Sequence, residues 1–97
     1  MRVEFAEAAE HELTAAVNHY NEQLEGLGFE FAAEVKKALG LIEAHPQAWP
    51  KMSDKWRRHR VRRFPYGLVY GIDGQQITIV AVMHLAQDPT PWTDMSL

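Results

Sequence analysis

The sequence contains no cysteine, which excludes disulfide bonds, thiolate zinc sites and cysteine nucleophiles. No apolar run approaches the roughly 18 residues that cross a bilayer. The first residues, Met1 to Glu7, lack the apolar core of a secretory signal. Glycine-rich phosphate loops, H-E-x-x-H patterns and nucleophile elbows are also missing. We therefore expect a cytoplasmic protein with no membrane association, no metal and no organic cofactor.

Charge is divided unevenly along the 97 residues, although the net charge is only −3. Residues 1–44 hold nine Glu and three Lys/Arg, a net charge of −6. Residues 45–97 hold seven Lys/Arg and four Asp, a net charge of +3. All seven of these cations lie between Lys51 and Arg63. The asymmetry indicates a surface for an anionic partner.

Hydrophobic periodicity divides the chain into six regular segments. Glycines at 26 and 28 separate two helices, Pro46 and Pro50 interrupt regular structure, and Asp73-Gly74 is a tight-turn signal. The expected segments are a strand at Arg2–Phe5, helices over Ala6 to about Leu24 and about Phe29 to Ala44, and strands at Arg57–Phe64, Tyr66–Ile72 and Ile77–His84.

This order, β-α-α-β-β-β, predicts an α+β domain of two layers, with a helical hairpin packed on an antiparallel sheet. The whole chain, 1–97, is expected to form one domain, with residues 93–97 as a disordered tail. Trp49 is expected to cover one end of the core. Trp92 is expected to pack back on the sheet.

The basic strand has a definite expected geometry, because successive side chains of a strand point to opposite faces. Arg58, Arg60 and Arg62 would share one face as an anion-binding row. Arg57, His59, Val61 and Arg63 would share the other face. The alternative is an edge strand whose charges only prevent aggregation.

One set of residues could support catalysis. His84 ends the last strand, and a histidine can act as a general acid or base near neutral pH. Arg60 and Arg62 could hold a phosphodiester, which would complete a metal-free site for RNA cleavage. The alternative for His84 is a strand-end residue that hydrogen-bonds locally. Tyr66 could stack on a base, whereas Tyr70 is expected in the core.

Several stretches resemble the RelE/ParE toxins of type II toxin–antitoxin systems. They are Gly26-Leu27-Gly28-Phe29, the loop with Pro46 and Pro50, the run from Arg60 through Arg62-Arg63-Phe64-Pro65-Tyr66 to Tyr70, and the strand Ile77–His84. The resemblance covers nearly the whole chain in the same order. It implies the two-layer fold and a toxin neutralised by a cognate antitoxin. In that family, ParE-like members poison DNA gyrase and RelE-like members cut messenger RNA in the ribosome.

Three departures from the RelE-like pattern favour the ParE-like branch, one of which is the lack of an arginine near the C-terminus. Gly67 stands where a basic residue is usual in the aromatic strand, and Gln87 replaces the arginine of a His-x-x-Arg-x-Pro pattern. We therefore expect a gyrase inhibitor. The alternatives are a ribosome-dependent endoribonuclease, with the ribosome and mRNA as partners, and a non-toxic partner-binding relative. The expected partner-binding residues are Arg58, Arg60, Arg62, Arg63, Tyr66 and Trp92.

Overall fold

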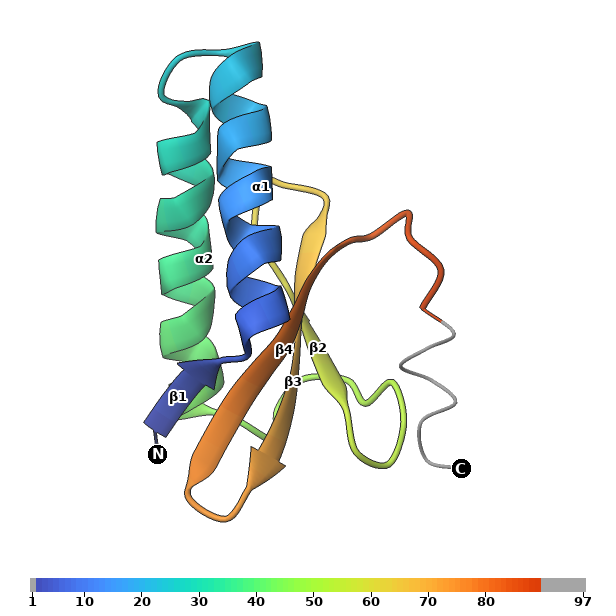
Figure 1. Cartoon of the computed structure of the whole chain (residues 1–97). Coiled ribbons are helices and arrows are strands. Elements are labelled where there is room, and N and C mark those ends of the chain that lie inside the picture. Colours follow the sequence, from blue (N-terminus) through green and yellow to red (C-terminus); the bar gives the residue numbers. More distant parts are fainter. Residues whose placement is uncertain (1, 90–97) are drawn as a thin grey trace.

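The computed structural model describes residues 2–89, and it confirms the predicted order of two helices and four strands. Trp92 and the expected tail at 93–97 lie outside the described residues. The elements of Figure 1 are β1 (Arg2–Phe5), α1 (Glu7–Gln23), α2 (Leu27–Ala44), β2 (Arg57–Arg60), β3 (Tyr66–Asp73) and β4 (Gln76–His84).

The four strands form one sheet in the order β1-β4-β3-β2. β2, β3 and β4 make the expected antiparallel meander. β1 instead lies parallel to β4, so the sheet is mixed rather than entirely antiparallel. The helical hairpin separates β1 from the meander in sequence, and this long connection lets β1 run in the same direction as β4. The two helices stand side by side against one face of the sheet (Figure 1).

The core lies between the hairpin and this face of the sheet. Leu68 and Tyr70 of β3 and Ile77 and Ile79 of β4 are fully buried there, opposite Phe31 of α2. Four aromatic rings join the layers, with centroids 5.0 to 6.0 Å apart: those of Tyr20, Phe31, Phe64 and Tyr66. Burial of these rings fixes the hairpin on the sheet.

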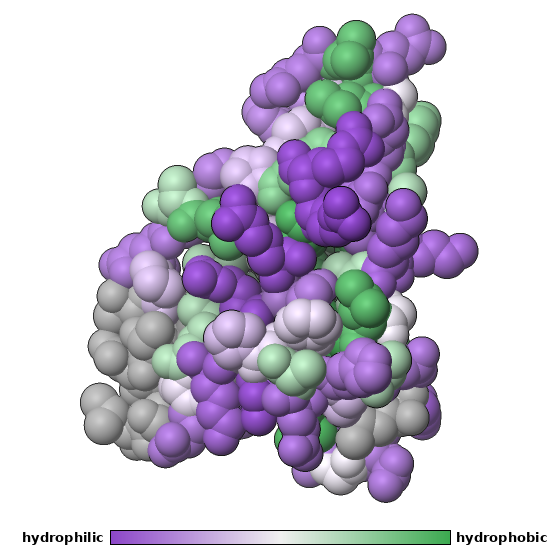
Figure 2. All heavy atoms as spheres, turned by 180° about the vertical axis from the view of Figure 1, so that it is seen from behind, coloured by the Kyte–Doolittle hydropathy of each residue, from purple (hydrophilic) through white to green (hydrophobic). Residues whose placement is uncertain are grey.

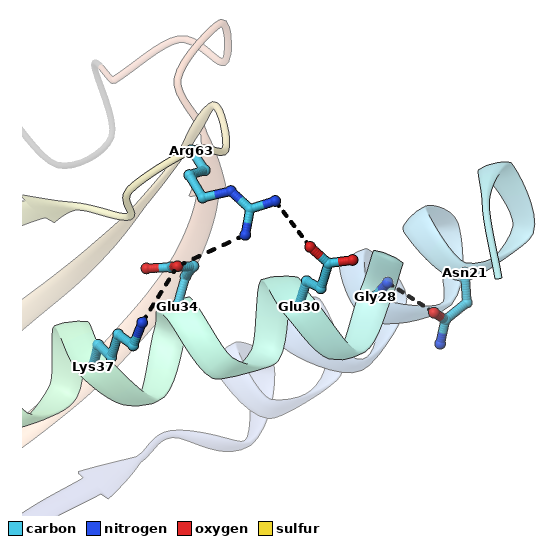
Figure 3. A network of polar contacts seen from close by, with 6 residues as sticks. All are labelled: Asn21, Gly28, Glu30, Glu34, Lys37 and Arg63. Carbon is cyan, nitrogen blue, oxygen red and sulfur yellow. Dashed lines mark hydrogen bonds and ion pairs between the residues drawn. The ribbon is translucent and has the colours of Figure 1, made fainter. Parts of the chain in front are cut away.

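The helices meet at a close contact near the free end of the hairpin. Gly26 adopts the left-handed conformation (φ 87°) that turns the chain between α1 and α2. The Gly28 N–H donates to Asn21 Oδ1 at 2.7 Å (Figure 3). A Cβ on Gly28 would lie 2.1 Å from the Val17 carbonyl oxygen, so this approach requires glycine.

The predicted strand Arg57–Phe64 is too long, because β2 ends at Arg60. Val61 is fully buried, and its N–H donates to the Tyr66 carbonyl at 2.8 Å across a tight connection to β3. Arg63 within this connection has φ 72°, a left-handed conformation that no strand contains. Burial of Val61 and Phe64 bends the chain at the point where sequence alternation predicted a straight strand.

Arg63 ties this connection to α2. Its Nη2 donates to Glu30 Oε1 at 2.9 Å, and its Nη1 lies 3.9 Å from Glu34 Oε2 (Figure 3). Glu34 is also 3.7 Å from Lys37 Nζ. The ion pairs are partly exposed, so they compensate only in part for the left-handed backbone at Arg63.

Substitutions at Arg63 should separate the stabilisation by its ion pairs from the cost of its left-handed backbone conformation. We expect Arg63→Ala to lower the free energy of unfolding by about 0.5–1 kcal/mol, because the ion pairs are lost and the unfavourable φ is kept. Arg63→Gly should be about 1 kcal/mol more stable than Arg63→Ala, since glycine adopts positive φ without a Cβ clash. Urea unfolding measures both. A glycine variant less stable than the alanine variant would show that the backbone is not strained.

Candidate functional site

The register of β2 against β3 assigns its side chains to the two faces of the sheet. Arg57 lies opposite Tyr70, and His59 lies opposite Leu68, on the face covered by the helices. Arg58 lies opposite Val69, which belongs to a second cluster on the outer face. Arg60 follows Arg58 on that outer face by strand alternation. The two faces are therefore as predicted for residues 57 to 60.

Arg62 does not join Arg58 and Arg60. It lies in the connection after β2 and lines a hollow on the helix side together with Glu34, Lys37 and Arg63. The predicted row of three arginines is therefore wrong in its third member, because the strand ends before Arg62. The row consists of Arg58 and Arg60.

A groove surrounds these two arginines, and we call it the outer-face groove. Its lining is Trp49, Pro50, Lys51, Met52, Arg58, His59, Arg60 and Leu85. It holds three cations and no carboxylate, and within residues 2–89 none of these cations forms an ion pair. Such a groove can bind an anionic ligand or an acidic peptide segment.

Sequence reasoning missed Lys51 as a member of this groove. Its position depends on a contact outside the regular strands: Lys51 forms an isolated bridge with Arg57, and the Arg58 N–H donates to the Pro50 carbonyl at 3.1 Å. No local pattern signals this return of the loop to β2, so only the structure could place Lys51 beside Arg58.

Gly67 has a structural role in the groove. A Cβ at this position would lie 2.9 Å from both Cγ and Cδ of Arg58. The aliphatic part of Arg58 therefore lies over the space that Gly67 leaves on β3. Gly67 thus makes room for a cation from the neighbouring strand.

The side chains of β2 that face the helices make contacts that hold the fold together. The Arg57 guanidinium donates to the carbonyls of Gln47 and Trp49 at 3.1 and 2.8 Å, which fixes the loop before β2. The Tyr70 hydroxyl donates to the Pro46 carbonyl at 2.6 Å, and Tyr70 is fully buried, as expected. Burial raises the pKa of Tyr70 to about 12, although the nearby charge of Arg57 opposes this shift.

Trp49 packs against the edge of the core, as predicted, and its ring contacts that of His59 in a tilted arrangement, with centroids 4.1 Å apart. Burial lowers the pKa of His59 below its ordinary value of 6.5. Burial therefore disfavours the charged form of His59. Lys51, Arg58 and Arg60 supply the positive charge of the outer-face groove.

His84 has the local hydrogen bonds of a strand-end residue. Its Nδ1 accepts from the Ala86 N–H at 3.0 Å, and its own N–H donates to Gln87 Oε1 at 2.7 Å. It lies opposite Tyr66, with ring centroids 5.2 Å apart, on the helix-covered face. Arg60 is on the other face. The residues suggested for RNA cleavage are therefore not brought together, since Arg62 occupies the separate hollow beside Glu34.

A second exposed feature lies at the free end of the helical hairpin. Apolar side chains gather there in the rear view (Figure 2). Phe29 is 70% exposed and Leu24 is 61% exposed. These side chains carry no chemistry of their own, but they leave apolar surface open to a partner.

Within residues 2–89, no three His, Asp or Glu side chains are grouped so that they could hold a metal ion. No helix in this part of the chain is long and apolar enough to cross a bilayer.

Comparison with known proteins bears on the family and on the fold. A family model described as the ParE toxin of type II toxin-antitoxin systems, parDE, matches residues 3–89. The structure titled "Chromosomal ParDE TA system from P. aeruginosa" has a similar fold, with a TM-score of 0.74 and 18% sequence identity. The match covers 87% of this chain and 95% of that chain. No curated protein matches in sequence.

Proposed function

The chain belongs to the ParE toxin family of type II toxin–antitoxin systems, and from this premise we propose that it inhibits DNA gyrase and is neutralised by a cognate antitoxin encoded beside it. It acts by binding, through the outer-face groove, rather than by cutting RNA. The observation that carries the proposal is the basic lining of this groove, in which Lys51, Arg58 and Arg60 form no ion pair within residues 2–89.

The placement of His84 supports binding over catalysis. A general acid or base has to lie within hydrogen-bond reach of the group that it serves. His84 directs Nδ1 to the Ala86 N–H and lies on the opposite face of the sheet from Arg58 and Arg60. Gln87 adds no charge near His84, and its Oε1 instead accepts a hydrogen bond from the His84 N–H.

A supercoiling assay with purified protein tests the proposal. We expect micromolar protein to inhibit negative supercoiling of plasmid DNA by gyrase. Arg60→Glu should require at least about tenfold more protein, because it places a carboxylate among the cations of the groove. Lys36→Glu, an equal change in net charge on the exposed side of α2, should remain within about twofold of the parent protein.

The outcomes separate the candidate functions. Absence of inhibition by the folded parent protein would overturn the gyrase assignment. Equal losses for both variants would show that net charge acts rather than the groove. Induced expression that leaves growth unharmed, from a soluble and folded protein, would identify a non-toxic partner-binding relative.

A further inference from the structure

The outer edge of β2 lies between two hollows that share one residue. β2 ends the strand order of the sheet, and its only neighbouring strand among the described residues is β3. The outer-face groove lies on one side of this edge, and the hollow that contains Arg62 lies on the helix side. His59 lines both of them. The two hollows therefore adjoin at His59.

The loop before β2 covers only the first part of this edge. The Arg58 N–H donates to the Pro50 carbonyl at 3.1 Å, whereas the Val61 N–H points the other way, to the Tyr66 carbonyl of β3. Backbone donors alternate in direction along an antiparallel strand, so the Arg60 N–H points to the same side as that of Arg58. Within residues 2–89 no loop carbonyl accepts it. A backbone donor is thus available next to the residue at which the two hollows meet.

Four cations line the two hollows without an ion pair in the described part of the chain. We call them the basic belt: Lys51, Arg58 and Arg60 on the outer face, and Arg62 on the helix side. Val61 is fully buried between Arg60 and Arg62, and both arginines are exposed. The buried valine fixes the bend, so the basic belt turns around the edge of the sheet.

The carboxylates near the basic belt are already engaged by other cations. Among the described residues that line the two hollows, Glu34 is the only acidic one. It lies 3.9 Å from Arg63 Nη1 and 3.7 Å from Lys37 Nζ, and Glu30 accepts a hydrogen bond from Arg63 (Figure 3). These ion pairs neutralise both carboxylates and leave the charge of Arg62 uncompensated.

The course of the basic belt favours a single, flexible polyanionic strand as its ligand. Arg58 and Arg60 are two residues apart, roughly 7 Å along β2, so they meet successive charges of an extended chain. A DNA duplex is stiff over about 150 base pairs and cannot follow a turn around a sheet edge. An unpaired nucleic-acid strand can follow it, and its bases can stack on the rings of Trp49 and His59 that line the path. An acidic peptide offers the same charge but makes no use of these rings.

We propose that the basic belt binds an unpaired strand of DNA by its phosphate groups, around the edge of β2. Arg58 and Arg60 hold phosphates on the outer face, and the Arg60 N–H donates to a phosphate oxygen at the turn. Arg62 holds the phosphate that follows on the helix side. This inference rests on the proposed function for the source of the strand, because DNA is the substrate of gyrase. The toxin then contacts the DNA that gyrase holds.

Fluorescence anisotropy with the full chain and a labelled oligothymidylate of about twelve nucleotides tests the inference without gyrase. We expect a Kd of about 1–100 µM at low salt, and a slope of about −2 to −3 when the logarithm of the association constant is plotted against that of the salt concentration. A duplex of equal length should bind at least about fivefold more weakly, because it cannot follow the turn. Absence of binding by the folded chain at low salt would overturn the inference. If that chain still inhibits gyrase, the proposed function stands and the groove contacts an acidic protein surface.

Two neutral substitutions separate the basic belt from the outer-face groove alone. Arg60→Gln and Arg62→Gln should each weaken oligothymidylate binding about three- to tenfold and make the salt slope shallower by about 0.7, because each removes one phosphate contact. Lys36→Gln removes the same charge from an exposed position of α2 that lines neither hollow, and it should change the affinity less than about twofold.

The remaining outcomes would each contradict the inference. Parent-like affinity for Arg62→Gln would confine binding to the outer face and overturn the turn around the edge. Equal losses for all three variants would show that net charge acts rather than the basic belt. An oligouridylate of equal length bound at least about tenfold more tightly than the oligothymidylate would replace DNA by RNA as the ligand. Absence of gyrase inhibition by a chain that binds the oligothymidylate would instead overturn the proposed function.

Discussion

Replacing Gly28 by alanine is expected to lower the free energy of unfolding by about 2–4 kcal/mol. The new Cβ would lie 2.1 Å from the Val17 carbonyl oxygen and 2.7 Å from Asn21 Cγ. The first of these atoms belongs to the backbone of α1, so the helices have to separate. Their separation also weakens the hydrogen bond from the Gly28 N–H to Asn21.

Gly40 provides the matched control, because it lies in the same helix and is exposed. A Cβ at Gly40 meets no heavy atom within 4 Å. We expect Gly40→Ala to raise the free energy of unfolding by about 0.5–1 kcal/mol, since alanine favours the helix and restricts the unfolded chain. Chemical denaturation of the two variants checks both signs. Destabilisation of similar size at both positions would show that helix packing does not decide the result.

Truncation of Phe31 is expected to have the largest effect, a loss of about 3–5 kcal/mol of unfolding free energy for Phe31→Ala. Phe31 is fully buried, and its ring lies 5.1 Å from Phe64, 5.1 Å from Tyr66 and 5.3 Å from Tyr20. The cavity would remove contacts between α2, the β2–β3 connection and β3 at once. A domain of this size has about 5–15 kcal/mol to lose, so the variant should unfold at or near physiological temperature.

Phe29, two residues away on α2, is the control for this truncation. Its side chain is 70% exposed, so Phe29→Ala should change the unfolding free energy by less than about 0.5 kcal/mol. Calorimetric unfolding of both variants measures the difference. A large loss of unfolding free energy for Phe29→Ala would contradict the exposure of the Phe29 side chain in the folded protein.

Most elements of the fold could be predicted because their apolar patterns are long. The helices and the last two strands were placed to within about two residues, and β1 was placed at Arg2–Phe5 as found. The direction of β1 could not be derived, because four residues carry no information about the strand that they join. β2 was extended too far, since alternation does not reveal that Val61 turns inward and that Arg63 takes a positive φ.

The site was predicted only as far as local periodicity reaches. Alternation along β2 correctly grouped Arg58 with Arg60, and Arg57 with His59. It failed for Arg62, which follows the end of the strand. Lys51 could not be found at all, because its place in the groove depends on an isolated bridge to Arg57 outside the regular strands. A single bridge of this kind leaves no trace in the spacing of the sequence.

The two glycines of β3 have a consequence for related sequences. A Cβ at Gly71 would lie 2.8 Å from Trp56 Cζ3, just as one at Gly67 would meet Arg58. The Trp56 and Arg58 side chains thus lie over the glycines of β3, where no side chain projects. Trp56 and Gly71 are fifteen positions apart in the sequence, and Arg58 and Gly67 are nine positions apart. In homologues, residues 56 and 71 should covary in volume, as should residues 58 and 67. A bulky residue on β3 would then have to be matched by a shorter one at the corresponding position before or within β2.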